Sequence, residues 1–298
     1  MRSLKTIITG TAIGLLALSG CGQSGSPGDS DGGGETQAEA PEYKVDDGFA
    51  LDDSKTWKKA HDAGKLKVGV KFDQPGLGNK EAGADAPQGF DIEIAKMTAA
   101  SMGFKPDQIE WVETVSANRE PFLQQGNVDM IVATYTINDE RKKVIDFAGP
   151  YYMAGQDLLV KSDSDIGGPD QLSGKKVCSV DGSTPAKRIK DEYKDAELVT
   201  YDTYSKCVTD LQSGSVDAVT TDDAILRGYA KQYDGEFKVV GKPFSEEPYG
   251  IGLPKGDSAM KDAVNKSLKA HEDDGTWKKA FEYTLGDAEG VEPPAIDS

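Results

Sequence analysis

The chain has 298 residues, of which 37% are hydrophobic, which is enough to build the cores of about two globular domains. Its formal net charge of −17 argues against a nucleic-acid partner and against a basic face that binds membranes. No apolar stretch follows the N-terminal one at a length suited to a bilayer, so we expect neither a channel nor a single-chain membrane receptor.

The first residues have the pattern of a secretory signal peptide, which we predict over residues 1–20. Arg2 and Lys5 precede the apolar run Ile7–Leu18, which is too short for a comfortable membrane span. The run ends in L-S-G-C and resembles the bacterial lipobox, where cleavage leaves Cys21 as a lipidated (palmitate-bearing) N-terminus. A plain signal peptide followed by an incidental cysteine is the alternative.

Residues 21–50 are predicted to be a flexible linker. Gly22–Glu42 is rich in Gly, Ser, Asp, Glu and Pro, a composition that cannot bury a core. A lipid on Cys21 and a solvated linker would hold a lipoprotein at the extracellular face of the cell membrane. At the other end, residues 291–298 are predicted to form a loose tail.

The next part of the chain alternates helical and strand patterns, with Gly64, Gly103 and Gly126 as helix stops. In chain order we predict a helix over Thr56–Gly64, a strand over Leu66–Phe72, a helix from Phe90 to Gly103, a strand over Ile109–Val112, a helix over Arg119–Gln125 and a strand over Met130–Ala133.

A second series of the same kind follows the extended stretch Tyr151–Leu159. Its first helix should begin with Thr184 as N-cap and Pro185 at the first helical position. The other predicted elements are strands over Lys176–Val180, Leu198–Thr200, Val216–Thr220 and Phe237–Val240, and helices over Ser205–Ser213, Ala224–Tyr233, Ser258–Glu272 and Thr276–Leu285.

Alternating strands and helices predict an α/β fold of open, mainly parallel sheets with helices on both faces. We expect two lobes, because a second βα series follows the first, and the Pro- and Gly-rich segment after Lys242 is suited to a return crossover. The first lobe would comprise residues 51–153 and 249–290, and the second residues 154–248. In such sheets ligands bind at the carboxyl ends of the strands.

The two lobes share a sequence echo. L-Q-Q-G-N-V-D, which ends at Asp129, corresponds to L-Q-S-G-S-V-D, which ends at Asp217. Each is a helix end, a Gly stop and the start of a strand, although this unit is common in α/β proteins. Thr134 and Asp222 then occupy equivalent positions at the ends of these strands.

Cys178 and Cys207 remain once the signal segment is set aside, and in an exported chain they most simply form one disulfide. Buried free thiols are the alternative. A metal site is not expected, because His61 and His271 lie in charged helical stretches without the spacing of ligands.

The strongest candidate site follows the strand that ends near Ala133. Thr134 and Thr136 carry hydroxyls at the strand end, and Arg141 follows on the next turn. Hydroxyl and backbone donors together with the planar fork of an arginine can hold a carboxylate. The alternative interpretation is that these residues have no role in binding and form only a strand, a turn and a surface arginine near Glu140.

The second lobe supplies the complementary charge. Asp222 suits an ammonium group, and Ser183 and Thr184 offer donors at a helix N-terminus, which favours an anion. Together with Arg141 and Thr136, this set matches the two ends of a free amino acid. A ligand that bridges two lobes favours their closed state.

Over residues 65–286 the chain resembles the extracellular solute-binding proteins of polar amino-acid ABC transporters. The resemblance rests on ordered motifs: G-F-D ending at Asp91, T-x-T-x-x-x-x-R ending at Arg141, D-G-S-T ending at Thr184, and V-D-A leading to Asp222. It implies a two-lobed fold of the type II periplasmic-binding-protein kind, with the lobes joined by two crossover strands. It also implies that Arg141, Thr136 and the Thr184 N–H bind an α-carboxylate, and that Asp222 and the Thr134 carbonyl bind the ammonium.

The resemblance also implies where side-chain specificity lies: just after the first strand and just before the helix at Arg119. These places hold Lys71, Ser116 and Arg119, with Tyr204 as a further candidate. Two cations suit a second carboxylate, whereas a neutral amide would leave that charge unpaired. Many members of the family place an aromatic ring over the ligand after the first strand; here that region holds Gln74, and Phe72 is the nearest aromatic.

The chain is similar to lipid-anchored glutamate-binding proteins of high-GC Gram-positive bacteria. This implies a monomer without cofactor that delivers L-glutamate or a similar acidic amino acid to ABC permease and ATPase subunits. Aspartate or glutamine binding and a sensory role with a signalling partner remain open. A dehydratase on the same fold is disfavoured, because the only carboxylate assigned to the cleft already serves an ammonium.

Overall fold

The structure is a computed structural model that describes residues 39–296. The predicted signal peptide and Cys21 lie outside these residues. Between residues 39 and 296, no helix combines the length and the apolar character needed to cross a membrane.

The first lobe is built on a sheet with the strand order β4-β1-β5-β12-β6. β1 pairs in parallel with both β4 and β5, whereas β12 runs antiparallel to β5 and β6. The strands are β1 (Leu66–Val70), β4 (Ile109–Glu113), β5 (Met130–Ile131), β6 (Asp146–Ala154) and β12 (Glu247–Leu253).

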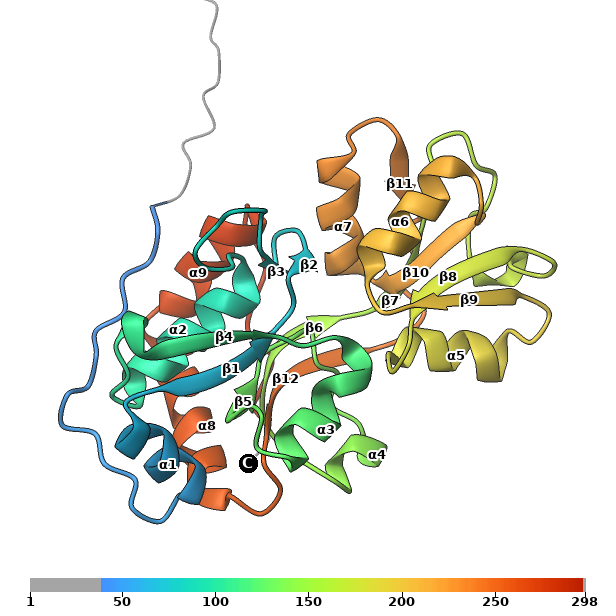
Figure 1. Ribbon diagram of the computed structural model, residues 1–298. Helices are drawn as coiled ribbons and strands as arrows, with labels where there is room; N and C mark the ends of the chain where they lie inside the picture. The colour runs from blue at the N-terminus through green and yellow to red at the C-terminus, as the bar shows by residue number, and fades with distance from the viewer. Residues whose placement is uncertain (1–38, 297–298) are drawn as a thin grey trace, which may run out of the picture. The chain divides into compact units, whose positions relative to one another are not determined.

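Side chains around β5 alternate between two cores, which explains why helices cover both faces of this sheet. Met130 and Val132 pack in the larger cluster, and Ile131 and Ala133 in the smaller one with Leu123. The larger cluster includes residues of four helices: α1 (Lys55–Ala63), α2 (Phe90–Ser101), α8 (Ser258–Asp273) and α9 (Thr276–Leu285). The smaller cluster includes a residue of α3 (Arg119–Gln124), and the short helix α4 (Asp139–Lys142) lies near α3 (Figure 1).

The second lobe repeats this plan. Its sheet has the order β11-β7-β10-β8-β9, and Figure 1 shows α5 on one face with α6 and α7 on the other. The elements are β7 (Gln156–Lys161), β8 (Lys176–Val180), α5 (Thr184–Glu192), β9 (Glu197–Tyr201), α6 (Tyr204–Ser213), β10 (Ala218–Asp222), α7 (Asp223–Gln232) and β11 (Phe237–Val239).

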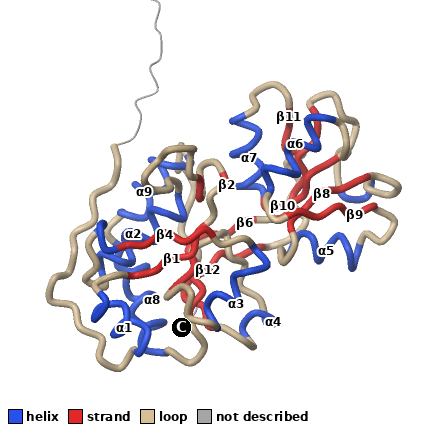
Figure 2. Tube along the Cα trace, viewed as in Figure 1, coloured by secondary structure: helices blue, strands red, loops and turns tan. Residues whose placement is uncertain are grey.

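The predicted two-lobed α/β fold is confirmed, but each sheet is mixed rather than mainly parallel. β8 pairs in parallel with β9 and β10, while β7 pairs antiparallel with β10 and β11. The strand next to the parallel set, β12 in the first lobe and β7 in the second, runs against that set. The edge strand beyond it, β6 or β11, is antiparallel to this neighbour and so runs with the parallel set again. Figure 2 shows the strands of both lobes in red.

The sequence echo corresponds to a repeated structural unit. Asp129 Oδ2 accepts a hydrogen bond from Lys67 N at 2.9 Å, and Asp217 Oδ2 accepts one from Lys176 N at 2.8 Å. Each aspartate thus ties the start of one parallel strand to its neighbour. The ends of β5 and β10 are therefore equivalent places in the two lobes.

The chain leaves the first lobe at Gly155 and returns through the segment that ends at Glu247. A Cβ atom at Gly155 would lie 2.7 Å from the Ser245 carbonyl oxygen, closer than real contacts allow. Glycine therefore permits the two connections to lie against each other.

The end of the predicted linker differs from the prediction, because it is packed on the first lobe. Tyr43 Oη donates to Glu93 at 2.8 Å, and Asp46 N donates to Ala100 O at 3.0 Å. At the other terminus, Val291 and Ile296 pack against the main core, although a loose tail is predicted there.

The predicted disulfide joins Cys178 of β8 to Cys207 of α6, with the Cα atoms 5.5 Å apart. Both sulfurs are buried, so the bond fixes α6 to the sheet of the second lobe.

Reduction of this disulfide should lower the free energy of unfolding by about 2–4 kcal/mol, because the bond closes a loop with a sequence separation of 29. Urea unfolding with and without dithiothreitol measures the difference. A variant with both cysteines replaced by alanine is the control and should not respond to the reductant. Equal stability of the wild type in both conditions would contradict the expectation.

Candidate functional site

The ends of strands from both lobes meet around a small cavity of about 10 Å³, which is the space that one water molecule needs. Most of the residues predicted for the site line it together: Ser116, Arg119, Thr134, Thr136, Ser183, Thr184, Tyr204 and Asp222. Lys71 and Arg141 are adjacent and contact lining residues without lining the cavity themselves. Tertiary folding therefore brings the predicted residues of the two lobes to one place.

Asp222, at the end of β10, supplies a carboxyl group to the cavity. Its Oδ2 accepts a hydrogen bond from Tyr249 Oη at 2.7 Å, whereas Oδ1 has no partner among the described residues. Burial, with the nearby Glu247 charge, raises the pKa of Asp222 to about 8. A cationic donor beside Oδ1 would both satisfy this oxygen and favour the ionised form.

Thr134 has a backbone conformation unusual for a β-branched residue, with φ of 43°. Asp91 holds it there: Oδ2 accepts from Thr134 N at 2.8 Å, and Oδ1 accepts from Tyr151 Oη at 2.6 Å. Burial raises the pKa of Asp91 to about 6 despite these hydrogen bonds. Asp91 is a site residue that the sequence reasoning did not assign, although it ends the G-F-D motif.

Gln74 is a second residue without a predicted role in binding. It is fully buried, and its Oε1 accepts from Thr134 Oγ1 at 3.1 Å, while its Nε2 has no partner among the described residues. Phe72 is only partly buried and lies under Lys80, whose Nζ is 5.3 Å from the ring centroid. Gln74 rather than Phe72 therefore adjoins Thr134 at the cavity.

Arg119 braces the wall of the cavity. Its guanidinium donates to three carbonyl oxygens of the first lobe: Ser116 at 3.2 Å, Ala133 at 3.1 Å and Thr134 at 3.3 Å. A fourth hydrogen bond crosses to the second lobe, where Gly182 O accepts at 3.3 Å. These contacts use four of its five N–H groups.

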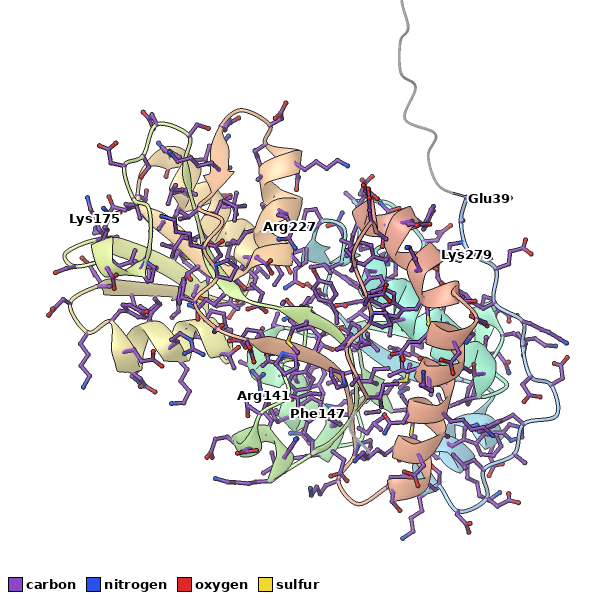
Figure 3. All side chains as sticks on the ribbon, turned by 180° about the vertical axis from the view of Figure 1, so that it is seen from behind. Glu39, Arg141, Phe147, Lys175, Arg227 and Lys279 are labelled. Carbon is purple, nitrogen blue, oxygen red and sulfur yellow. A yellow bond between two sulfur atoms is a disulfide. The ribbon has the colours of Figure 1, made fainter. Side chains whose placement is uncertain are left out.

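Arg141, labelled in Figure 3, lies where the two lobes meet, and it shares the Gly182 carbonyl oxygen with Arg119. It donates to Thr136 O at 2.7 Å, to Gly182 O at 3.0 Å and to Glu120 Oε1 at 3.1 Å. Burial lowers its pKa to about 10, which still leaves a cation at neutral pH. The ring of Tyr135 supports both guanidinium groups, at 4.2 Å from Arg119 and 4.9 Å from Arg141.

Lys71, directly after β1, is a buried cation. Its Nζ donates to Ser116 Oγ at 2.9 Å, and it has no ion pair with any residue between 39 and 296. Burial, with the charge of Arg119, lowers the pKa of Lys71 to about 7. Its protonation is therefore sensitive to any new charge nearby.

The start of α5 differs from the prediction by one residue. Ser183, not Thr184, is the N-cap, because the Ser183 hydroxyl accepts from Ala186 N at 3.1 Å and donates to Val180 O at 2.7 Å. The Thr184 hydroxyl instead faces the first lobe, 3.3 Å from Thr136 Oγ1, and donates to Glu247 at 2.8 Å. Ser183 thus shapes the helix end, and Thr184 is the hydroxyl that contacts the other wall.

Tyr204 is buried at the start of α6, and burial together with the Asp222 charge raises its pKa to about 12. It is a neutral hydroxyl at physiological pH. Within the described part of the chain, no cluster of His, Cys, Asp and Glu has the arrangement of a metal site.

Comparison with known proteins finds relatives over most of the chain. Residues 66–287 match the bacterial extracellular solute-binding proteins, family 3. The chain is 40% identical to the glutamate-binding protein GluB of Corynebacterium glutamicum, over 95% of this chain and 90% of that one. It is 36% identical to the glutamine-binding protein GlnH of Bacillus subtilis, over 94% of this chain and 96% of that one.

Solved structures show the same fold. An ancestral arginine-binding protein bound to glutamine has a TM-score of 0.70 and 38% identity, covering 75% of this chain and 99% of that one. A solute receptor for L-cysteine of Neisseria gonorrhoeae has a TM-score of 0.74 and 30% identity, covering 80% of this chain and 98% of that one. These relatives are binding proteins rather than enzymes. The chain belongs to the bacterial extracellular solute-binding proteins of family 3.

Proposed function

We propose that this protein captures L-glutamate between its lobes and delivers it to an ABC importer. The observation that carries the proposal is a buried acid and a buried base at the cavity, each without a counter-charge of its own. Asp222 keeps one buried oxygen without a partner, and Lys71 is a buried cation without an ion pair among the described residues. A zwitterion with an acidic side chain would supply counter-charges for both.

The α-amino and α-carboxylate ends are assigned by charge and by free donors. Asp222 would accept the ammonium at Oδ1, with the Thr134 carbonyl as a second acceptor. Three contacts of Arg141 occupy three of its five N–H groups, which leaves donors for the α-carboxylate. The hydroxyls of Thr136 and Thr184 and the N–H groups at the start of α5 would complete this end, whereas the Ser183 hydroxyl is committed to its helix cap.

The far end of the ligand would meet Lys71, Ser116, Arg119 and Tyr204. A carboxylate there gains an ion pair with Lys71, while an amide gains only hydrogen bonds. Glutamine is the second candidate. With a pKa of about 7, Lys71 can be neutral at little cost in free energy, and a neutral amine can face an amide. One relative is also a glutamine-binding protein. Similarity to GluB favours glutamate. Aspartate is shorter and would leave the Lys71 end unfilled.

The family membership supports export and delivery of the ligand to membrane permease and ATPase subunits. A lipid on Cys21 would keep the monomer near those subunits. The ordered contacts of Tyr43 and Asp46 with the first lobe would make this lobe the attachment point of the tether.

Replacing Arg141 by Ala should weaken glutamate binding by about 100-fold or more, because charge-assisted hydrogen bonds to the α-carboxylate are lost. Isothermal titration calorimetry measures the dissociation constant. Lys143→Ala, which removes an exposed cation two residues further along the chain, is the matched control and should leave the dissociation constant unchanged. An Arg141→Ala protein that is folded by circular dichroism and binds normally would remove Arg141 from the site.

The preference for glutamate over glutamine should fall as the pH rises above about 7, by up to tenfold per pH unit. A ligand carboxylate raises the pKa of Lys71, so glutamate binding takes up a proton wherever free Lys71 is neutral and bound Lys71 is charged. Below pH 7 Lys71 is already protonated in the free protein, and the preference should be constant. Calorimetry with both ligands across pH 6 to 9 measures the ratio.

Asp222 does not disturb this comparison, because both ligands present the same α-ammonium and release the same proton from it. Lys71→Met is the control: it removes the titrating group and should make the ratio independent of pH. A ratio that stays constant in the wild type would argue for glutamine, or for a side-chain end that does not contact Lys71.

Replacing Cys21 by Ala should release the protein into the culture medium, because no lipid can then be attached. Fractionation with an antibody measures the distribution between membrane and medium. Retention of the variant on the membrane would show that another segment anchors the chain.

A further inference from the structure

The N-terminus of α6 is capped from the other lobe. Its own N-cap residue, Thr203, makes no side-chain cap hydrogen bond. Instead Asp73, on β2 (Asp73–Gln74) of the first lobe, accepts from Tyr204 N at 2.8 Å and from Ser205 N at 3.3 Å through Oδ2. A carboxylate at a helix N-terminus satisfies free N–H groups and interacts favourably with the helix dipole.

A second helix of the same lobe contacts this segment. Tyr229 Oη of α7 donates to the Asp73 carbonyl oxygen and lies 3.4 Å from its Oδ2. Next to it, a Cβ atom at Gly228 would overlap the Pro75 carbonyl oxygen, so only glycine allows β2 and the turn after it to approach α7 this closely. The segment Asp73–Pro75 therefore fits the second lobe at both α6 and α7.

We propose that Asp73 is a latch of the closed state: it caps α6 across the cleft and so adds to ligand affinity without touching the ligand. When the lobes separate, Asp73 and the α6 N–H groups return to water, so their interaction stabilises only the closed arrangement. Any ligand that requires closure gains from this bias. The inference rests on the proposed function only in taking the cleft as the binding site.

Asp73 could act in another way, since its charge also favours the protonated form of Lys71. That effect would reach only a ligand with an acidic side chain. A latch acts on glutamate and glutamine alike, so comparing the two ligands separates the explanations.

Asp73→Ala should weaken binding of L-glutamate and of L-glutamine by the same factor, roughly 3- to 30-fold, in calorimetric titrations. Asp257→Ala is the matched control, because Asp257 caps α8 within the first lobe and accepts from Met260 N at 3.1 Å. It should lower the melting temperature and leave both affinities unchanged. In a Gly228→Ala background, which already hinders the contact, Asp73→Ala should have a smaller effect.

Unchanged affinities in Asp73→Ala would overturn the latch, and a loss confined to glutamate would assign Asp73 to Lys71 instead. If the wild type binds neither ligand, the proposed function fails, yet the latch stays testable. Hydrogen exchange of the first turn of α6 in the free protein should be faster in Asp73→Ala than in wild type. Equal exchange rates would refute the cap.

Discussion

Charged groups removed from water need partners, and the cavity between the lobes depends on this constraint. Asp222 and Lys71 have shifted pKa values for the same reason, because burial disfavours the charged form of each. One is a carboxylate with a free oxygen and the other is a cation without an ion pair among the described residues. A ligand of opposite charges at the right separation relieves both, which links occupation of the cleft to its electrostatics.

The remaining polar residues keep these groups in place. Asp91 holds the Thr134 backbone in a left-handed conformation that would otherwise be unfavourable, and Tyr249 orients Asp222. Arg119 connects the end of β5 to the turn before α3, because it donates to both Ala133 O and Ser116 O. A binding site on such a braced frame loses little conformational freedom when the ligand arrives.

The two lobes touch on both sides of the cavity. Arg119 and Arg141 converge on the Gly182 carbonyl on one side, and Asp73 reaches α6 on the other. Between them, the connections at Gly155 and before β12 lie against each other and are suited to act as a hinge. The proposed site accounts for the similarity of this chain to both glutamate- and glutamine-binding proteins, since these two ligands differ only at the side-chain end that we assign to Lys71.

Much of the architecture follows from the sequence by itself. Helices such as Lys55–Ala63 and strands such as Lys176–Val180 were predictable because local periodicity and glycine stops encode them. The order of βα units predicted two lobes, and the motifs around Arg141 and Asp222 identified most residues of the cavity. The exported context also predicted the bond between Cys178 and Cys207.

Only the tertiary structure decided the rest. Three features depend on neighbours far apart in sequence: the antiparallel pairing of the crossover strands, the support of Thr134 by Asp91, and the contact of Asp73 with α6. A fourth, the use of Ser183 rather than Thr184 as the helix cap, depends on a shift of one residue. The helix and strand propensities of local segments cannot predict these contacts, because the contacts form only when separate elements pack against one another.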